Sequence, residues 1–195
     1  HLAASIESDL ALMASLDRLD SEVHFSQTAV GDRWLAKALK EDSCNILGVE
    51  DSGHLVMSAP HPKGGRCLVG DGVASLLAVL CAMACENRAL AFTKGFKKRI
   101  SIKDSNRSRW TGNNELADSV EHIANLKLGN MLRHGLVGEN NLMLLEMEGV
   151  SIGVRNSGTQ AKTNVSLRLA PGVDNSIMLE TLDLILACLK QALVD

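Results

Sequence analysis

The longest apolar segment of the chain, residues 73–84, places the tightest limit on its fold. A helix formed from this segment is apolar on every side, and such a helix is normally buried. The segment is shorter than the roughly 18 residues that a membrane span requires, and Glu86, Asn87 and Arg88 follow it. We therefore predict a helix that packs against a sheet, and no membrane span.

The chain before this helix alternates between strand and helix patterns. Apolar residues recur at helical or at alternate spacing, and polar turns separate the segments. The predicted elements are a helix over residues 9–19 with Asp9 as its N-cap, a strand over 22–28, a helix through 34–39, and strands 45–49 and 54–58 around the turn 50–53. Alternating strands and helices predict an α/β unit.

A polar, basic stretch between Glu86 and Arg109 marks a predicted boundary, which divides the chain into residues 1–90 and 91–195. Its cations are Lys94, Lys97, Lys98, Arg99, Lys103, Arg107 and Arg109. They are typical of a solvated linker or strand edge, or else some of them face an anionic ligand, and both interpretations stay open. The predicted α+β elements that follow are a helix over 115–131, strands over 143–147, 150–155 and 164–169, and a helix over 176–193.

The charge of the chain excludes partners that need a strong global field. The formal net charge is −3 and the pI is about 6.1, so neither nucleic acid nor an anionic membrane is expected as a partner. Any anion must therefore be bound by a local group of residues.

The cysteines do not form a disulfide or zinc pattern. There are 5 of them, an odd number, with no CxxC pair and no histidine at metal-ligand spacing. Reduced thiols and a cytoplasmic location follow as expectations. Cys81 and Cys85 share one face of the apolar helix, and we expect them to pack in the core.

The segment Arg155-Asn156-Ser157-Gly158-Thr159 lies between two apolar strands and holds the residue types that bind phosphate. An arginine fork matches two phosphate oxygens, while hydroxyls and successive backbone N–H groups form an anion-holding concavity. The residues alone are equally compatible with an ordinary hairpin turn.

The same segment resembles the Arg-x-Ser-Gly-Thr-Glu-Pro phosphate loop of the α-D-phosphohexomutases, which comprise phosphoglucomutases, phosphomannomutases and phosphoglucosamine mutases. The resemblance implies that Arg155, Asn156, Ser157, Gly158 and Thr159 bind phosphate. Gln160 and Ala161 stand where the family usually has Glu and Pro, so the stiffness of the loop and one supporting carboxylate differ.

A second segment, Glu50-Asp51-Ser52-Gly53-His54, is similar to the family's sugar-recognition loop, Gly-Glu-x-Ser-Gly-His, with Val49 in place of the leading Gly. The resemblance implies that Glu50 and Ser52 bind ring hydroxyls and that His54 lies beside them. A carboxylate and a hydroxyl on one exposed turn can accept from and donate to neighbouring hydroxyls. Ordinary hairpin chemistry is the alternative.

Two shorter matches complete the resemblance, which runs from about Asp9 to Leu169. The segment Val30-Gly31-Asp32-Arg33-Trp34 is similar to Val-Gly-Asp-Arg-Tyr of phosphoglucosamine mutases, which makes Arg33 a candidate substrate contact. The segment Gly70-Asp71-Gly72 matches the family's Gly-Asp-Gly before a long helix, and we interpret it as structural.

Two catalytic motifs of the family, the phosphoserine loop and the Asp-Gly-Asp-x-Asp-Arg magnesium loop, do not occur in this sequence. The resemblance therefore implies the C-terminal two domains of the family: a third domain with a mixed α/β sheet, and a smaller α+β phosphate-binding domain. No catalytic nucleophile, metal site or bound cofactor is expected here, although His54 could move a proton or orient the loop.

The expected function is a part of a phosphohexomutase, an isomerase that interconverts hexose 1-phosphates and 6-phosphates. Missing N-terminal domains of the same polypeptide would supply the phosphoserine and Mg²⁺, with a glucose 1,6-bisphosphate-type activator, so this chain alone should be inactive. The expected ligand is a phosphorylated hexose, whose sugar the sequence does not identify. A stand-alone, non-catalytic sugar-phosphate module and a protein that binds another anion are the alternatives.

Overall fold

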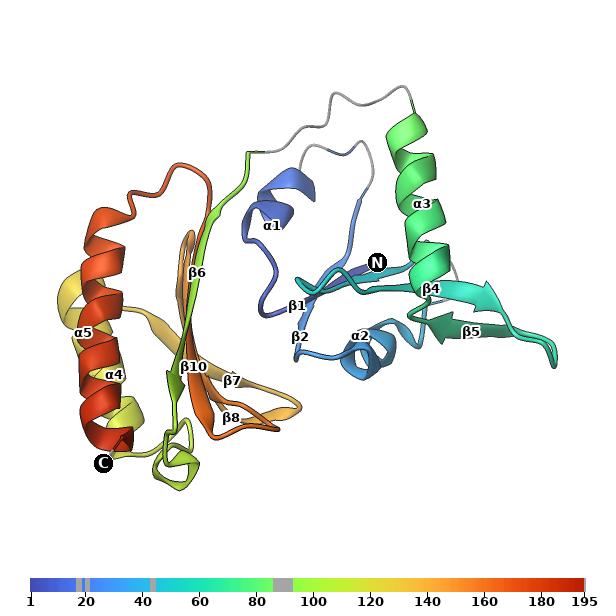
Figure 1. Cartoon of the computed structure of the whole chain (residues 1–195). Coiled ribbons are helices and arrows are strands. Elements are labelled where there is room, and N and C mark those ends of the chain that lie inside the picture. Colours follow the sequence, from blue (N-terminus) through green and yellow to red (C-terminus); the bar gives the residue numbers. More distant parts are fainter. Residues whose placement is uncertain (17–18, 20–21, 43–44, 86–92, 195) are drawn as a thin grey trace. The chain divides into compact units, whose positions relative to one another are not determined.

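The computed structural model describes residues 1–16, 19, 22–42, 45–85 and 93–194 (Figure 1). The chain divides into two compact units, one formed by His1–Ser8 with Leu12–Thr93 and the other by Asp9–Ala11 with Lys94–Asp195. The boundary expected between residues 90 and 91 lies in 86–92, outside the described residues.

The first unit is built on a five-stranded mixed sheet (Figure 1). Its strand order is β2-β1-β3-β4-β5, with β1 parallel to β2 and β3, and β4 antiparallel to β3 and β5. The strands are β1 (Leu2–Ser5), β2 (Phe25–Thr28), β3 (Leu47–Val49), β4 (Leu55–Pro60) and β5 (Arg66–Val69).

Two of these strands were not predicted from the sequence, for different reasons. All four residues of β1 are buried, so the strand lacks the alternation of polar and apolar residues that marks a half-buried strand. Strand β5 follows a Pro- and Gly-containing loop and begins at the exposed Arg66, so only its pairing with β4 reveals it.

Helix α2 (Asp32–Leu39) forms the core of this unit together with the sheet. Leu35 and Leu39 are both 0% exposed and pack with Ala3 and Val56. The helix approaches β3 so closely that a Cβ on Gly48 would lie 2.9 Å from the Cβ of Leu35. A residue without a side chain is therefore required at this position for the observed packing.

The other elements predicted before residue 60 are present with shifted limits. Helix α1 covers Ala11–Leu16, where 9–19 was expected, and residues 17 and 18 lie outside the described part. Asp9 accepts a hydrogen bond from the backbone N–H of Ala11 (2.8 Å), as expected of an N-cap. The predicted hairpin is formed by β3 and β4.

Helix α3 (Gly72–Ala84) has the predicted extent, but the prediction that it is buried against a sheet was wrong. None of its residues is buried, and Val73 and Met83 are 70% and 65% exposed. Cys81 and Cys85 are exposed too, which contradicts the expected core packing. An apolar sequence predicts that a helix is buried, but it does not specify the element against which the helix packs.

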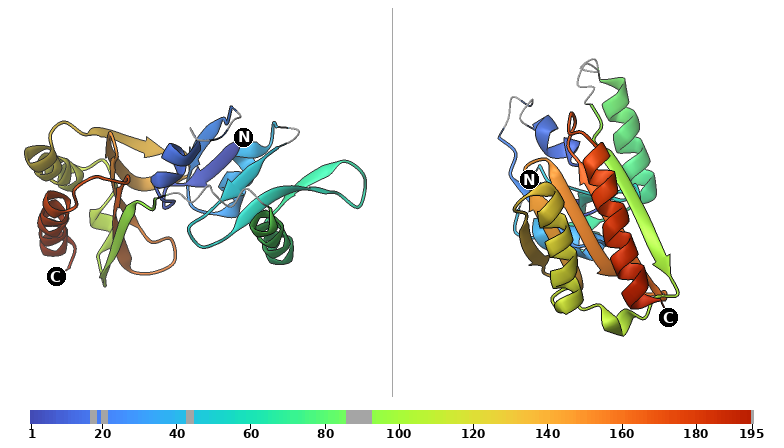
Figure 2. Two further views of the ribbon diagram at one scale, coloured as in Figure 1. Left: turned by 90° about the horizontal axis from the view of Figure 1, so that it is seen from above. Right: turned by 90° about the vertical axis from the view of Figure 1, so that its left-hand side faces the viewer.

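The second unit is a five-stranded antiparallel sheet with two helices on one face (Figure 2). The order is β6-β10-β9-β8-β7, and α4 and α5 lie side by side against it. The elements are β6 (Phe96–Lys103), the 3-10 turn η1 (Arg107–Arg109), α4 (Glu115–Leu128), β7 (Leu132–Leu136), β8 (Glu139–Met147), β9 (Val150–Asn156), β10 (Lys162–Leu169) and α5 (Ser176–Leu193).

A single large core joins these helices to the sheet. Its largest fully buried side chain is Trp110, which is 1% exposed and donates from Nε1 to the carbonyl of Asn141 (2.9 Å). Helix α4 was predicted to reach residue 131 but ends at Leu128, because Gly129 has a φ of 95° that stops the helix. Strand β7 begins at Leu132, directly after the span that was assigned to that helix.

The basic stretch after residue 93 becomes the edge strand β6, whose residues alternate in exposure. Ile102 is buried in the core, while Lys97, Arg99 and Lys103 are exposed. Charged side chains on an edge strand discourage pairing with other sheets. The fold class is therefore α/β followed by α+β, as the sequence predicts.

No helix in the described part of the chain combines the length and the apolar character that a membrane crossing needs.

Candidate functional site

The hairpin between β3 and β4 presents the segment Glu50–His54 at its tip. The N–H of Glu50 donates to the carbonyl of His54, and the N–H of Gly53 donates to the carbonyl of Glu50, both at 3.0 Å. Gly53 has a φ of 90°, which strongly favours glycine. The backbone therefore closes a tight turn that holds Glu50, Ser52 and His54 on one short loop.

The Glu50 carboxylate is fixed by two donors. One oxygen accepts from the backbone N–H of Gly31, the N-cap residue of α2, and the other accepts from the Ser52 hydroxyl (2.9 Å). The first contact ties the hairpin tip to the start of the helix. A carboxylate offers about four lone pairs, so both oxygens keep capacity for a ligand.

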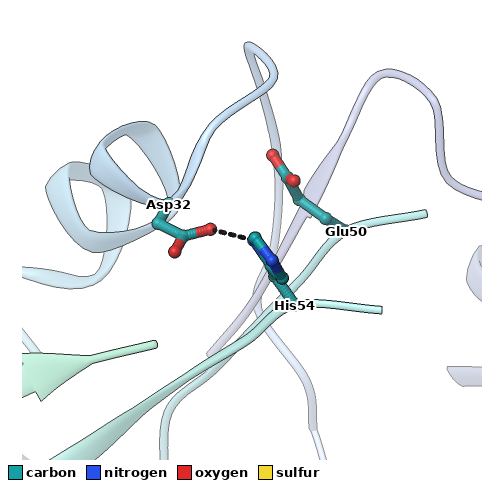
Figure 3. A group of neighbouring side chains, drawn as sticks. All are labelled: Asp32, Glu50 and His54. Carbon is teal, nitrogen blue, oxygen red and sulfur yellow. Dashed lines mark hydrogen bonds and ion pairs between the residues drawn. The ribbon is translucent and has the colours of Figure 1, made fainter. Parts of the chain in front are cut away.

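His54 has a partner that the motif does not contain. Its Nδ1 lies 3.0 Å from Oδ1 of Asp32, in the first turn of α2, and both side chains are partly exposed, at 62% and 43% (Figure 3). The sequence resemblance singled out Arg33 in the segment Val30–Trp34 and passed over Asp32. The signal in the sequence was the position of the Asp32 carboxylate next to Arg33, which was already a candidate.

The structure does not join Arg33 to this hairpin. Arg33 is exposed, and its guanidinium lies 5.2 Å from the ring centroid of Trp34. No hydrogen bond between Arg33 and the tip occurs in the described part of the chain. Of the four sugar-site candidates, the hairpin itself brings together Glu50, Ser52 and His54.

In the second unit, the connection between β9 and β10 forms the turn that resembles the phosphate loop. The Ser157 N–H donates to the carbonyl of Lys162 (2.9 Å), and the Ser157 hydroxyl accepts from the N–H of Gln160 (3.3 Å). Gly158 and Thr159 form the exposed apex, and among the described contacts their N–H groups have no acceptor. The apex thus presents backbone donors and a hydroxyl to solvent.

Arg155 lies at the end of β9 with its side chain only 17% exposed. Its Nη1 contacts Oε1 of Glu139 on the neighbouring strand β8 at 3.3 Å. The guanidinium is thus held against the sheet by a carboxylate. An anion bound at the turn would compete with Glu139 for the Arg155 guanidinium or share the guanidinium with it.

Asn156 and Arg107 brace the base of the turn. The Asn156 amide donates to the carbonyls of Arg107 and Trp110 (both 2.9 Å), and its oxygen accepts from Thr163 (2.9 Å). Arg107 is exposed and donates from Nη1 to the carbonyl of Ser157 (2.7 Å). Arg107 is therefore a cation at the turn that the motif did not indicate, although the basic stretch contained it.

Comparisons with known proteins point to the phosphoglucomutase/phosphomannomutase family. Residues 2–95 match the family described as phosphoglucomutase/phosphomannomutase, alpha/beta/alpha domain III. Phosphoglucosamine mutase from Paenarthrobacter aurescens is 28% identical over 177 residues, which cover 88% of this chain and 35% of the relative. Phosphoglucosamine mutase from Alkalilimnicola ehrlichii is 37% identical over 90 residues, 46% of this chain and 18% of the relative.

A crystal structure of a phosphoglucomutase/phosphomannomutase family protein from Burkholderia thailandensis superposes with a TM-score of 0.61. The match covers 98% of this chain and 37% of that chain at 15% identity, so it shows the fold. Residues 2–95 belong to this family as its domain III. The chain spans about a third of the length of its curated relatives. The match covers 35% of the phosphoglucosamine mutase from P. aurescens and 37% of the one from Streptomyces griseus.

The residues present do not fit the magnesium loop of the phosphohexomutases. In Gly70-Asp71-Gly72, the Asp71 side chain accepts from the N–H of Ala74 (2.7 Å) and caps helix α3. A hard cation needs several oxygen ligands, and Asp71 belongs to no ligand cluster among the described residues. Asp71 thus has a structural role as the N-cap of helix α3.

One cluster of side chains in the described residues has ligand atoms spaced for a cation, namely Asp32, Glu50 and His54, within 4.8 Å of one another (Figure 3). Each of these side chains already makes a hydrogen bond within the first unit: Asp32 with His54, and Glu50 with Gly31 and Ser52. The cluster is thus a polar, partly exposed site whose internal bonds account for its geometry.

Proposed function

We propose that this chain binds a phosphorylated hexose as part of a phosphohexomutase, an isomerase that moves a phosphoryl group between the 1- and 6-positions of a hexose. The hairpin tip of the first unit binds the sugar, and the β9–β10 turn of the second unit binds phosphate. The observation that carries the proposal is the Glu50 carboxylate, held by Gly31 and Ser52 at the tip of a domain III hairpin.

Sugar recognition follows from the chemistry of the tip. An ionised carboxylate accepts from two vicinal hydroxyls, and the Ser52 hydroxyl can turn from Glu50 to donate to the sugar or accept from it. Because Gly31 and the turn hold Glu50 in place before binding, little side-chain entropy is lost on binding. His54 lies beside the carboxylate and contributes a further hydrogen bond, and Arg33 is a more distant candidate.

Phosphate recognition in the proposal uses the apex of the β9–β10 turn. The N–H groups of Gly158 and Thr159 and the Ser157 and Thr159 hydroxyls supply neutral donors, as in other anion-binding turns. Arg155 and Arg107 add charge-assisted hydrogen bonds. Asn156 keeps the base of the turn rigid through its contacts with η1.

Phosphoryl transfer in the family would use a phosphoserine, which gives its phosphoryl group to the hexose phosphate and receives the other phosphate back, and Mg²⁺, which would neutralise charge on the phosphoryl group. We propose that other domains of a longer polypeptide supply both, with a glucose 1,6-bisphosphate-type activator. The 195-residue chain alone would then be an inactive part of the enzyme. A cytoplasmic location stays a prediction from the reduced cysteines.

A non-catalytic sugar-phosphate module is the second candidate. It is favoured by the departures from the family motifs at Val49, Gln160 and Ala161. Turnover of a hexose 1-phosphate by the full-length gene product, with the bisphosphate activator and Mg²⁺, supports the mutase. Sugar-phosphate binding without turnover by that product supports the module.

Binding of glucosamine 6-phosphate to this chain tests the proposed function directly. The dissociation constant is measured by NMR titration for the wild type, Glu50→Gln and Ser52→Ala. Loss of the Glu50 charge removes charge-assisted hydrogen bonds of about 1.5–3 kcal/mol, so binding should weaken roughly tenfold to a hundredfold.

Glu41→Gln is the matched control, because Glu41 is an exposed carboxylate of the same unit outside the hairpin. Its dissociation constant should equal that of the wild type. Equal binding by Glu50→Gln and the wild type, or no binding by any of them, would contradict the proposed sugar site. Glucose and mannose 6-phosphates in the same assay identify the preferred hexose.

A further inference from the structure

The contact between Asp32 and His54 defines which nitrogen of the imidazole carries hydrogen. Oδ1 of Asp32 lies 3.0 Å from Nδ1 of His54, across 22 positions of the chain. An ionised carboxylate only accepts hydrogen bonds, so Nδ1 must be the donor. When the ring is neutral, the lone pair is then on Nε2.

Helix α2 keeps the Asp32 carboxylate in place. Asp32 is the first residue of the helix, where the free backbone N–H groups and the helix dipole favour a negative side chain. His54 follows directly after the tight turn and precedes β4. Both partners are thus attached to regular elements at positions with little freedom.

Gly70 makes room for the same carboxylate. A Cβ built on Gly70 would lie 2.7 Å from Oδ2 and 3.3 Å from Cγ of Asp32, so the carboxylate could not keep its position beside a larger residue. Gly70 is not in the left-handed region, so its backbone does not itself demand glycine. The first glycine of the Gly-Asp-Gly segment therefore has a steric function at the hairpin.

We propose that Asp32, with Gly70 behind it, is a positioning residue that holds neutral His54 in the Nδ1–H tautomer and leaves Nε2 as the acceptor beside Glu50. Among the described residues, Nε2 of His54 has no hydrogen-bond partner. In the proposed function, on which this role rests, Nε2 accepts a hydrogen from a sugar hydroxyl. The other tautomer would present a donor there.

Two other histidines of the chain provide internal references. Nδ1 of His61 accepts from the N–H of Lys63 (3.2 Å), so His61 must be in the opposite, Nε2–H tautomer. His122 is exposed and makes no hydrogen bond among the described residues. It therefore reports the ratio of the Nδ1–H to the Nε2–H tautomer for a ring without a partner. Comparison within one spectrum removes any dependence on solvent or temperature.

The test is long-range ¹H–¹⁵N correlation NMR of the whole 195-residue chain, in EDTA so that no metal-bound imidazole interferes. The pH is set above the titration of every imidazole, as judged from the same spectra. The expected ratio of Nδ1–H to Nε2–H at His54 exceeds that at His122 by about fivefold or more, as one hydrogen bond of ordinary strength implies. An Nε2–H ring at His54, or a ratio equal to that of His122, overturns the proposal.

Two substitutions separate the carboxylate from its position. Asp32→Ala removes the acceptor, and Gly70→Ala displaces it while the charge stays, so both should move the His54 ratio to that of His122. Gly72→Ala is the matched control, since a Cβ there meets nothing within 4 Å, and its ratio should equal the wild type's. An unchanged His54 tautomer ratio in folded Asp32→Ala overturns the proposal. If the variants do not fold, the comparison of His54 with His122 in the wild type decides alone.

A titration with glucosamine 6-phosphate distinguishes this inference from the proposed function. Asp32→Ala should weaken binding about fivefold if Nε2 accepts from the sugar. If the wild type has the expected tautomer but binds no sugar phosphate, the proposed function fails and the positioning of His54 stands. If His54 is in the other tautomer, the inference fails whether or not the sugar phosphate binds.

Discussion

A substitution of Gly48 by alanine tests the packing that supports the hairpin. Gly48 lies in β3, two residues before Glu50, beneath helix α2. An added Cβ would lie 2.9 Å from the Cβ of Leu35, 3.1 Å from the Cβ of Val56 and 3.3 Å from Cδ1 of Leu39. Non-bonded carbon atoms prefer about 3.5–4.0 Å, so all three contacts are too short.

The cost follows from the lack of room to relax. Leu35 and Leu39 are 0% exposed and Val56 is 1% exposed, and two of the three crowded atoms are Cβ atoms fixed to the backbone. Overpacking of this kind costs about 1–3 kcal/mol. In a domain of this size, each kcal/mol lowers the melting temperature by about 4–8 °C.

Unfolding is followed with the two indole N–H signals, because Trp34 belongs to the first unit and Trp110 to the second. Gly48→Ala should lower the melting point reported by Trp34 and leave that of Trp110 unchanged. Gly72→Ala is the control, since its Cβ meets open space and alanine there should be neutral or stabilise by up to about 1 kcal/mol. A Gly48→Ala variant as stable as the wild type would refute the packing of α2 on β3.

Three further predictions concern the second unit. Asn156→Ala removes the hydrogen bonds that brace the turn and should lower the unfolding free energy by about 1–3 kcal/mol in urea denaturation, and an unchanged midpoint contradicts the brace. Burial raises the pKa of the Cys188 thiol, so Cys188 should be alkylated more slowly at pH 8 than exposed Cys81 by mass spectrometry, and the reverse order counts against the fold. The Ser176 N–H lowers the pKa of Asp174 below its ordinary 3.8, so stability present above that pH is lost as the pH falls through the lowered value. The unfolding free energy of Asp174→Ala should accordingly be lower than that of the wild type at pH 7, and the difference should shrink towards pH 3. A difference that does not change with pH would exclude the hydrogen bond between Ser176 and Asp174.

The sequence predicts elements well where a local pattern determines them. The turn at Glu50–Gly53 needs a left-handed residue, and apolar segments flank it, so the hairpin could be located before the structure was known. Strand β1 could not, because burial on both faces removes the alternation of polar and apolar residues. The exposure of α3 could not be anticipated either, since its apolar sequence does not specify a neighbour.

The candidate sites show the same limit at the level of side chains. The motifs identify Glu50 and Arg155, but their partners lie on other elements. Glu139 reaches Arg155 through the pairing of β8 with β9, and Asp32 reaches His54 because α2 begins beside the hairpin. Such partners depend on register and helix packing, which single motifs do not encode.

Mapping of backbone amides during ligand addition tests most directly whether this chain recognises a sugar phosphate at the two turns. In ¹H–¹⁵N spectra, glucosamine 6-phosphate should shift the signals of Gly53 and Gly158, glucosamine should shift Gly53 but not Gly158, and inorganic phosphate should shift Gly158 but not Gly53. Saturable shifts in this pattern are expected if the first turn binds the sugar and the second binds phosphate. Unshifted signals at both glycines, with saturable shifts elsewhere or none at all, would contradict it.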